Sequence, residues 1–312
     1  MPTKKILPIG VVLMTYGSAT TSKNAKKFLE DVYPNGPDKG LVKEFQRRFD
    51  LVGGSPLIEI TLQQGHMLQT YLDKSQAINN YVVGVGFLHS PPAIDLAVTK
   101  LKAVGARKLI GIILSPQFSK FIMGGYAKAL QLAAEKNGFG VRDISIAGPW
   151  PEQPDFINLL SGRLVAKHRM LTKKYRQNVP IIFTTHSLPK RVVDKDPDYL
   201  KQLEKTMRAI VKKSKLSKSA WSYAYQSAGH TPEEWLKPDL VDILAEFKPI
   251  KVPAVLIVPL QFLADHLEIL YDLDIAAKEQ CEESNISYNR IELPNTDPMF
   301  IKTLASLVAR QS

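Results

Sequence analysis

Short apolar segments alternate with longer segments of helical periodicity along most of this chain, and this alternation limits the possible folds more than any other feature. The strand-like segments are residues 9–14, 81–87, 108–114, 141–148, 179–185, 220–227 and 252–260. The helical patterns between them cover residues 24–33, 39–51, 57–74, 92–104, 122–137, 154–172, 197–213 and 238–247. Most strand-like segments are continuously apolar, which is typical of strands covered on both faces. We therefore predict an α/β protein with doubly wound parallel sheets.

The length of the chain allows more than one domain. Its 312 residues suffice for one large domain or for two of about 150 residues each. About four predicted strands precede residue 150 and about three follow it, and prolines 149, 151 and 154 interrupt the middle of the chain. We predict two Rossmann-like domains, residues 1–150 and 151–297. We also expect a final helix at 298–309, within the C-terminal segment 298–312, to pack back on the first domain.

Two pairs of segments are weakly similar to each other. "PIGVVLMTYGS" (8–18) resembles "PIIFTTHSLP" (180–189), and "IILSPQFS" (112–119) resembles "LIVPLQFL" (256–263). Duplication of an ancestral half and chance similarity between buried strands both explain the pairs. If the halves are related, the strand ends of both face one shared cleft, because ligands of such sheets bind outside the carboxyl ends of the strands.

The charge and the absence of common nucleotide motifs narrow the functional classes. The net charge is +11 and the pI about 9.5, which suits nucleic acid, a membrane surface or an anionic small molecule. The densest cationic segment, residues 211–219, has the pattern of a solvated helix end, and no basic segment is interleaved with aromatic residues, so we expect no nucleic-acid partner. The chain lacks the GxGxxG, GxxxxGK[ST] and GxSxG motifs, which argues against a dinucleotide or phosphate-loop enzyme.

Cysteine usage and the N-terminus indicate the compartment. Cys281 is the only cysteine, so the chain can form neither an internal disulfide nor a CxxC metal or iron–sulfur site. This suits a reducing cytosol. The apolar segment near the N-terminus is interrupted by Pro8, lacks a clear cleavage site and is too short to span a bilayer. We expect an untargeted cytoplasmic protein without a transmembrane segment.

His186 and a row of acidic residues are the first candidates for chemistry. His186 lies in "TTHSLP", directly after the apolar segment "VPIIF", where a strand leaves the core. In "FLADHLEILYD", Asp265, Glu268 and Asp272 are three and four residues apart and would share one face of a helix. A solvated surface explains this row equally simply, and Asp265 could instead cap the helix. An imidazole and a carboxylate from two strand ends can also bind a divalent metal or relay protons.

Other strand exits carry weaker candidates. Tyr16 ends the first predicted strand, His89 follows the second, and Ser55 follows two glycines in "VGGSPL". Tyr16 could instead be a half-buried aromatic residue at a strand edge. Ser55 could instead belong to an ordinary loop. We interpret the remaining histidines as structural or solvated; they are His66, His168, His230 and His266.

Six motifs in a fixed order give the chain a resemblance to a known family. They are "YGS" (16–18), "GGSPL" (53–57), "SPQFSKF" with "GGY" (115–126), "THSLP" (185–189), "YQSAGHTPEEWLKPD" (225–239) and "FLADHLEILYD" (262–272). Together they resemble the ferrochelatase family, in its compact bacterial type, over nearly the whole chain. The resemblance implies two Rossmann-like domains around a porphyrin cleft and the insertion of Fe²⁺ into the porphyrin. It also implies no iron–sulfur cluster, because the compact type lacks the C-terminal cysteine extension.

The resemblance assigns roles to individual residues. His186 and Glu268 would be the catalytic pair that handles the metal and the protons, and Asp272 would belong to a possible outer metal site. Tyr16 would lie on the opposite face of the macrocycle, axial to the product iron, and it resembles the tyrosine that marks the branch using coproporphyrin III. The porphyrin site would be lined by Tyr16, Arg48, Ser55 and Tyr126, with His89, Tyr33 and Ser227 as further candidates.

The chain departs from the family pattern at three places. Tyr33 and Pro34 occupy the region where many compact members carry an arginine pair that concerns the porphyrin propionates. Leu88 stands where a lysine can precede the first-domain histidine, and Ala276 stands where the acidic row usually continues. The last difference weakens the expected outer metal site.

The expected function is therefore that of a lyase in haem biosynthesis that inserts Fe²⁺ into coproporphyrin III. Protoporphyrin IX is the alternative substrate, and a chelatase for another tetrapyrrole or metal, such as sirohydrochlorin with cobalt, is the alternative enzyme. A non-catalytic tetrapyrrole or metal carrier is the alternative from a different class. We expect a monomer with no permanently bound cofactor. Its partners would be porphyrin and Fe²⁺, together with transient iron or haem-pathway proteins.

Overall fold

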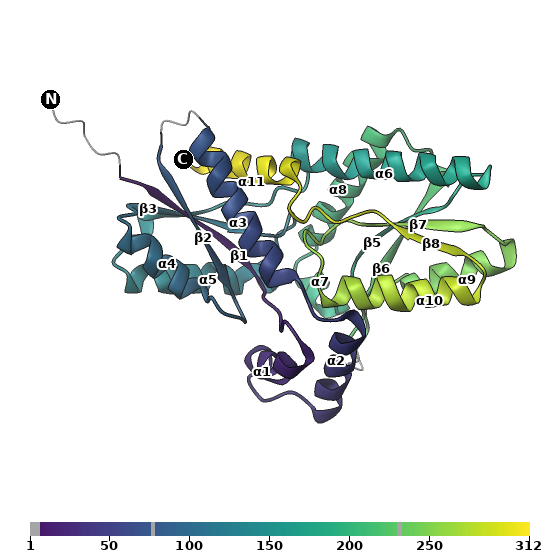
Figure 1. Cartoon of the computed structure of the whole chain (residues 1–312), viewed down its shortest axis with the longest axis horizontal. Helices are drawn as coiled ribbons and strands as arrows, with labels where there is room; N and C mark the ends of the chain where they lie inside the picture. Colours follow the sequence, from purple (N-terminus) through teal and green to yellow (C-terminus); the bar gives the residue numbers. More distant parts are fainter. Residues whose placement is uncertain (1–6, 76–78, 230–232) are drawn as a thin grey trace. The chain divides into compact units, whose positions relative to one another are not determined.

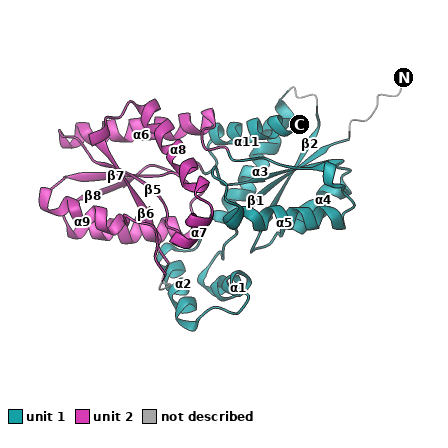
Figure 2. Ribbon diagram, turned by 180° about the vertical axis from the view of Figure 1, so that it is seen from behind, with its two compact units in different colours: residues 1–149, 295–312 teal, residues 150–294 magenta. Residues whose placement is uncertain are grey.

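The computed structural model describes residues 7–75, 79–229 and 233–312 (Figure 1). His230, which the sequence suggested to be structural or solvated, lies outside the described residues. The chain divides into two compact units (Figure 2). Unit 1 comprises residues 1–149 and 295–312, and unit 2 comprises residues 150–294. Each unit contains a four-stranded parallel sheet with helices on both faces, so the predicted α/β fold is confirmed.

The sheet of unit 1 has the strand order β2-β1-β3-β4. Its strands are β1 (Ile9–Thr15), β2 (Tyr81–Phe87), β3 (Lys108–Ile113) and β4 (Ile144–Ile146). In the parallel register, Ile9 of β1 faces Tyr81 of β2 and Lys108 of β3. β1 is an inner strand and residues 11–14 are completely buried, which explains its continuously apolar sequence.

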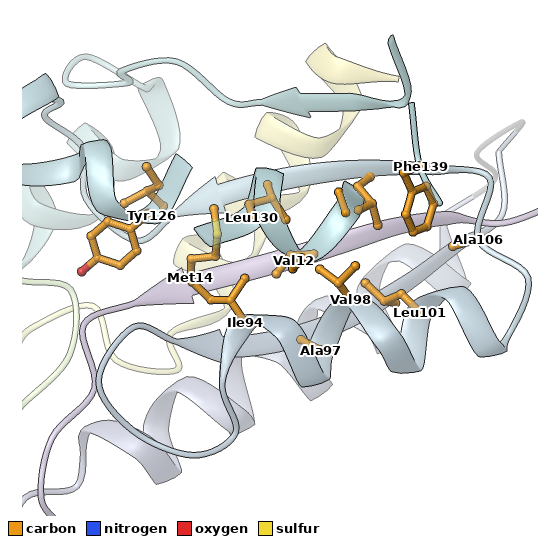
Figure 3. Packing of buried hydrophobic residues seen from close by; sticks show 14 of the residues in the cluster. Val12, Met14, Ile94, Ala97, Val98, Leu101, Ala106, Tyr126, Leu130 and Phe139 are labelled. Atoms are coloured by element: carbon orange, nitrogen blue, oxygen red, sulfur yellow. The ribbon is translucent and has the colours of Figure 1, made fainter. Parts of the chain in front are cut away.

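Helices cover both faces of this sheet. α3 (Leu57–Lys74) and α11 (Pro298–Gln311) pack together on one face, and α4 (Ile94–Ala103) and α5 (Lys120–Lys136) pack on the other. Figure 3 shows the core that α4 and α5 form with the sheet. Gly111 allows this close approach, because a Cβ atom there would lie 2.5 Å from a methyl carbon of Leu130. α1 (Ser22–Val32) and α2 (Lys39–Val52) pack against each other, and the short 3₁₀ helix η1 (Val141–Asp143) precedes β4.

The sheet of unit 2 repeats this topology with the order β6-β5-β7-β8. Its strands are β5 (Ile181–His186), β6 (Trp221–Gln226), β7 (Ala254–Pro259) and β8 (Ser287–Arg290). In each sheet the first and third strands are inner strands and the second and fourth are edges. The similar sequence pairs fall on equivalent strands, β1 with β5 and β3 with β7. This correspondence is what two related halves would produce.

Unit 2 also has helices on both faces of its sheet. α6 (Pro154–Tyr175) and α8 (Asp198–Ser214) pack together on one face. α9 (Leu240–Ile250), the π-helix η3 (Ile269–Ala277) and α10 (Lys278–Glu283) pack on the other. Two short elements complete the unit, α7 (Lys190–Lys195) after β5 and the 3₁₀ helix η2 (Lys218–Ala220) before β6.

Three details of the predicted elements were wrong. Unit 2 has a fourth strand, β8, which the sequence hides because it is a half-buried edge strand of polar composition, Ser-Tyr-Asn-Arg. The strand predicted at 141–148 is reduced to Ile144–Ile146, because its first residues form η1. The helix containing Glu268 starts at residue 267 and becomes a π-helix at Ile269. Within the described parts of the chain, no helix combines the length and the apolar composition needed to cross a membrane.

Candidate active site

The predicted site residues form two groups, one in each unit, and most follow the carboxyl ends of parallel strands. Unit 2 contains His186, Ser227, Glu268 and Asp272, and unit 1 contains Tyr16, Tyr33, Arg48, Ser55, His89 and Tyr126. His186 is the last residue of β5, Ser227 follows β6, and the chain after β7 leads to Glu268. Because neighbouring parallel strands end at the same edge of a sheet, these side chains gather at one edge of unit 2.

His186 faces Glu268 directly. Its Nδ1 atom forms a hydrogen bond with the backbone oxygen of Ser187. A carbonyl oxygen can only accept, so Nδ1 carries a proton and donates it. The other ring nitrogen, Nε2, lies 3.3 Å from Oε2 of Glu268. The structure thus brings together the histidine and the carboxylate that the sequence suggested as a pair.

His266 is a third member of this cluster, although the sequence had suggested only a structural or solvated role for it. Its Nε2 lies 3.7 Å from the same Oε2 atom of Glu268. Nδ1 donates to the backbone oxygen of Ala264 at 3.0 Å, and the ring lies 4.4 Å from the ring of Phe262. The sequence signal was its place two residues before Glu268. On a regular helix that spacing separates two side chains, but His266 lies in the turn before the helix.

Asp265 does not belong to a helical acidic row. It precedes the first helical residue, and its Oδ1 atom accepts a hydrogen bond of 3.2 Å from Nη2 of Arg290 on β8. The prediction that Asp265, Glu268 and Asp272 share one helix face was therefore wrong. Asp265 is instead neutralised by an arginine that is 25 residues away in the sequence.

Asp272 lies in the π-helix and is held by Ser227. The hydroxyl of Ser227 donates a hydrogen bond to Oδ2 of Asp272. Ser227 adopts a left-handed backbone conformation with φ of 59°, which is uncommon for a residue other than glycine. A π-helix closes its hydrogen bonds between residues five apart, so Asp272 lies less than one turn beyond Glu268. Ser227, a candidate for porphyrin contact, uses its hydroxyl within unit 2.

A half-buried glutamine that the sequence analysis missed holds the backbone of His186. The backbone N–H of His186 donates to Oε1 of Gln261 at 3.1 Å, and Nε2 of Gln261 donates to the hydroxyl of Tyr199 at 2.6 Å. Burial raises the pKa of Tyr199, so its phenol stays neutral at physiological pH. Gln261 lies in the segment "LIVPLQFL", whose polar residue directly after an apolar strand was the available signal.

Tyr16 and His89 lie side by side at the strand ends of unit 1. Their ring centroids are 4.6 Å apart, and Nδ1 of His89 lies 2.7 Å from Oδ2 of Asp31 on α1. The backbone N–H of His89 donates to the oxygen of Tyr16 at 2.9 Å, which joins the two loops. Gly17 has a φ of 95°, and a Cβ atom there would lie 2.6 Å from the hydroxyl oxygen of Ser90. The loop that presents Tyr16 therefore requires glycine at this position.

Tyr126 is packed into the core of unit 1. It lies on α5, is 6% exposed, and its ring stands at one end of the cluster in Figure 3 with the hydroxyl directed away from the other labelled residues. Burial, and to a lesser extent the nearby phenol of Tyr16, raise the pKa of Tyr126. Its hydroxyl therefore stays protonated and can donate a hydrogen bond at neutral pH.

Arg48 lies on α2 and is paired with Glu44. Nε of Arg48 lies 2.8 Å from Oε1 of Glu44, while Arg47 bonds both oxygens of the same carboxylate at 2.8 Å. Hydrogen bonds from Arg47 and then Arg48 lower the pKa of Glu44 to about 2. Arg48 therefore forms an ion pair with a carboxylate on the same helix.

Ser55 and Tyr33 occupy contrasting positions. Ser55 is buried after two glycines with positive φ, and Gly54 has no room for a side chain, since a Cβ atom would lie 2.5 Å from the backbone oxygen of Thr20. The hydroxyl of Ser55 has no hydrogen-bond partner among the described residues, and Ser55 lines a cavity of about 710 Å³ beside α3. Tyr33 directly follows α1 and is exposed.

No complete metal site is preformed in the parts of the chain that the structure describes. In residues 7–75, 79–229 and 233–312, no group of three or more His, Cys, Asp or Glu side chains is positioned to hold a metal ion.

Comparisons with known proteins cover almost the whole chain. A family model described as Ferrochelatase matches residues 8–312. The coproporphyrin III ferrochelatase of Oceanobacillus iheyensis is 31% identical over 307 residues, which cover 97% of this chain and 97% of that protein. The ferrochelatase of Herpetosiphon aurantiacus is 34% identical over 303 residues, which cover 96% of this chain and 98% of the relative.

One solved structure supports the fold independently. SirB from Bacillus subtilis with Fe³⁺ aligns with a TM-score of 0.55, covering 97% of this chain and 95% of that chain. The sequence identity is 11%, so this likeness concerns the arrangement of the elements alone. It agrees with two parallel sheets that share one topology.

Proposed function

Because the chain belongs to the ferrochelatase family, we propose that it inserts Fe²⁺ into a porphyrin and that this porphyrin is coproporphyrin III. The observation that carries the proposal is the approach of His186 and Glu268 to 3.3 Å at the carboxyl edge of a parallel sheet. The preference for coproporphyrin III is supported by relatives of that name that align over 97% of the chain.

The reaction has to move two protons and one metal ion. Two pyrrole N–H groups lose their protons, Fe²⁺ loses its water ligands, and the four ring nitrogens take their place. The charge balances, since one divalent cation replaces two protons. An enzyme for this exchange needs a group that accepts protons beside the ring nitrogens and a path that removes them.

His186 and Glu268 suit the acceptance of a proton. Because Nδ1 of His186 donates to Ser187, Nε2 either carries a second proton or presents a lone pair toward Glu268. A lone pair on Nε2 and a lone pair on the carboxylate oxygen repel each other at this distance. His186 and Glu268 therefore favour a cation between their two atoms. A proton released by the porphyrin meets that requirement, and the carboxylate stabilises the imidazolium that forms.

Glu268 offers the proton a way out. It lies between two imidazoles and is followed by Asp272, which Ser227 holds in place. We propose that protons pass from His186 to Glu268 and on to solvent along the Asp272 side. The same donor atoms also suit Fe²⁺ on its way to the ring, because imidazole nitrogen and carboxylate oxygen are ordinary ligands for this ion.

Tyr16 and Arg48 are the groups of unit 1 that suit a carboxylate-rich metalloporphyrin. The phenol of Tyr16 is 41% exposed after β1, and a phenol oxygen can act as an axial ligand of porphyrin iron. Arg48 is a cation suited to a propionate. Coproporphyrin III carries four carboxylates, so the net charge of +11 also favours its approach.

Further properties of the chain remain predictions. We propose that it works in the cytoplasm as a monomer, that Fe²⁺ is a substrate, and that it holds no permanently bound cofactor and no iron–sulfur cluster. The single cysteine of the chain, Cys281, is buried on α10, which supports the last point, since known clusters of this kind use several thiolates. Partners that deliver iron or accept haem precursors would bind transiently.

Anaerobic incubation of the purified protein with Fe²⁺ and a porphyrin tests the proposal. Multiple turnovers with coproporphyrin III, and slower turnover with protoporphyrin IX, are the expected results. Stoichiometric porphyrin binding without metal insertion would indicate a carrier, and activity with sirohydrochlorin and Co²⁺ alone would indicate another chelatase. His186→Ala serves as the control: it should bind porphyrin but lose more than about nine-tenths of the turnover, a change of roughly 1.4 kcal/mol or more in the barrier.

A further inference from the structure

One guanidinium connects both ends of the segment that carries Glu268. Arg290, on the edge strand β8, bonds Asp274 through two atoms, with Nε 2.8 Å from Oδ1 and Nη2 2.6 Å from Oδ2. Its Nη2 also donates to Oδ1 of Asp265 at 3.2 Å. Asp265 precedes the helix and Asp274 lies inside η3, so Arg290 joins two points on either side of Glu268.

The cluster is largely shielded from water. The side chain of Arg290 is 12% exposed, and its Nη1 donates to the backbone oxygen of Ile291 at 3.2 Å. The hydroxyl of Tyr288 donates to Oδ1 of Asp274 at 3.2 Å. Burial opposes the charge of Arg290, but the bonds and charges of Asp274 and then Asp265 raise its pKa above the ordinary value. The guanidinium therefore remains charged at neutral pH.

The backbone just before Glu268 is irregular. Leu267 is buried and anchors the backbone, but residues 264–266 have no regular secondary structure. A contact that holds this turn therefore also helps to fix the direction of the Glu268 carboxylate.

We propose that Arg290 is a positioning residue for iron insertion, which clasps Asp265 to Asp274 and so fixes the turn that holds Glu268 between His186 and His266. This inference rests on the proposed function. Arg290 acts through the backbone and does not touch the reacting groups. The planar guanidinium is required because it can bond two carboxylates at once, whereas the ammonium of lysine is a compact point charge without that fork.

Steady-state kinetics of Arg290→Ala and Arg290→Lys test the clasp. We expect kcat to fall by about 10- to 100-fold, the usual cost of misplacing a catalytic group by about 1 Å, while the KM for coproporphyrin III changes less than about twofold. Guanidinium chloride at a non-denaturing concentration should restore part of the kcat of Arg290→Ala, and equal concentrations of sodium chloride should not. Arg208→Ala is the matched control, because Arg208 forms an exposed pair with Glu204 at 2.8 Å on α8, and it should change neither kcat nor the response to guanidinium.

A second variant keeps the test decisive if the Arg290 variants do not fold. Asp265→Asn keeps the size of the side chain and the bonds between Arg290 and Asp274, so it should still fold and should lose kcat about tenfold. Retention of full kcat by folded Asp265→Asn, or a change in KM alone, would overturn the inference.

Hydrogen exchange separates this inference from the proposed function. The peptide covering residues 262–274 should exchange faster in the Asp265→Asn protein than in the wild type, while the peptide covering β5 should not change. This measurement needs no activity. A wild-type protein without iron insertion would refute the proposed function, and unchanged exchange at 262–274 would refute the clasp.

Discussion

Replacing Glu268 with glutamine removes the negative charge opposite His186 and leaves a side chain of nearly the same size. The carboxylate oxygen lies 3.3 Å from Nε2 of His186 and 3.7 Å from Nε2 of His266. In the proposed reaction His186 gains a positive charge when it accepts a porphyrin proton, and Glu268 stabilises that charge. Glu268→Gln should therefore slow metal insertion and leave porphyrin binding intact.

The size of the effect follows from the distance and the exposure. Two unit charges 3.3 Å apart attract each other by about 5 kcal/mol at an effective dielectric constant of about 20. The side chains of His186 and Glu268 are 24% and 37% exposed, so water weakens this attraction, and about 2–3 kcal/mol is a reasonable remainder. We therefore expect kcat to fall by about 30- to 160-fold. Loss of general base catalysis commonly costs about 10²- to 10⁴-fold.

Anaerobic insertion of Fe²⁺ into coproporphyrin III, followed by the loss of porphyrin fluorescence, gives kcat and KM for each variant. Asp272→Asn is the informative comparison, because Asp272 is held by Ser227 and would act only after Glu268; it should cost less than about tenfold. Glu282→Gln removes an exposed charge on α10 and should have no effect. Equal losses of kcat for Glu268→Gln and Asp272→Asn would refute a directional relay. Full activity of Glu268→Gln would show that the contact between His186 and Glu268 is purely structural.

Three further predictions concern other parts of the molecule. Tyr16→Phe should leave the fold intact and change the visible spectrum of bound iron coproporphyrin, because phenylalanine offers no axial oxygen; identical spectra would show that Tyr16 does not touch the iron. The lowered pKa of Glu44, about 2 against 4.5, should stabilise the fold above pH 4.5 and stop doing so as the pH falls through 2. Wild type and Glu44→Gln should differ in unfolding free energy by less than about 1 kcal/mol, because the helix is exposed. This difference should vanish in acid, and a difference that persists below pH 2 would contradict the prediction. Burial raises the pKa of the Cys281 thiol to about 11, so a thiol reagent should react at pH 8 only at the rate of unfolding, and rapid labelling of the native protein would contradict the buried position.

The class of fold and the location of the chemistry followed from local features of the sequence. A strand buried on both faces must be apolar along its length, and a crossover helix must be periodic, so the alternation alone predicted parallel sheets. His186 could be chosen because a polar residue directly after such a strand has to emerge at the carboxyl edge of the sheet. The motifs around Tyr16, His186 and Glu268 led to the ferrochelatase family for the same reason, since each is short and continuous.

The tertiary structure decided which neighbours those residues have. His266 joined the cluster because the turn after β7 is irregular, and the direction of a side chain in a turn cannot be read from helical spacing. Asp265 is not part of the expected acidic row, because it is paired with Arg290. Arg290 lies on β8, an edge strand that the polar sequence did not reveal. Gln261 supports His186 only because β7 lies beside β5 in the sheet. The sequence by itself determined periodic, local properties, whereas pairs of side chains distant in the chain depend on the packing of the strands and helices that bring them together.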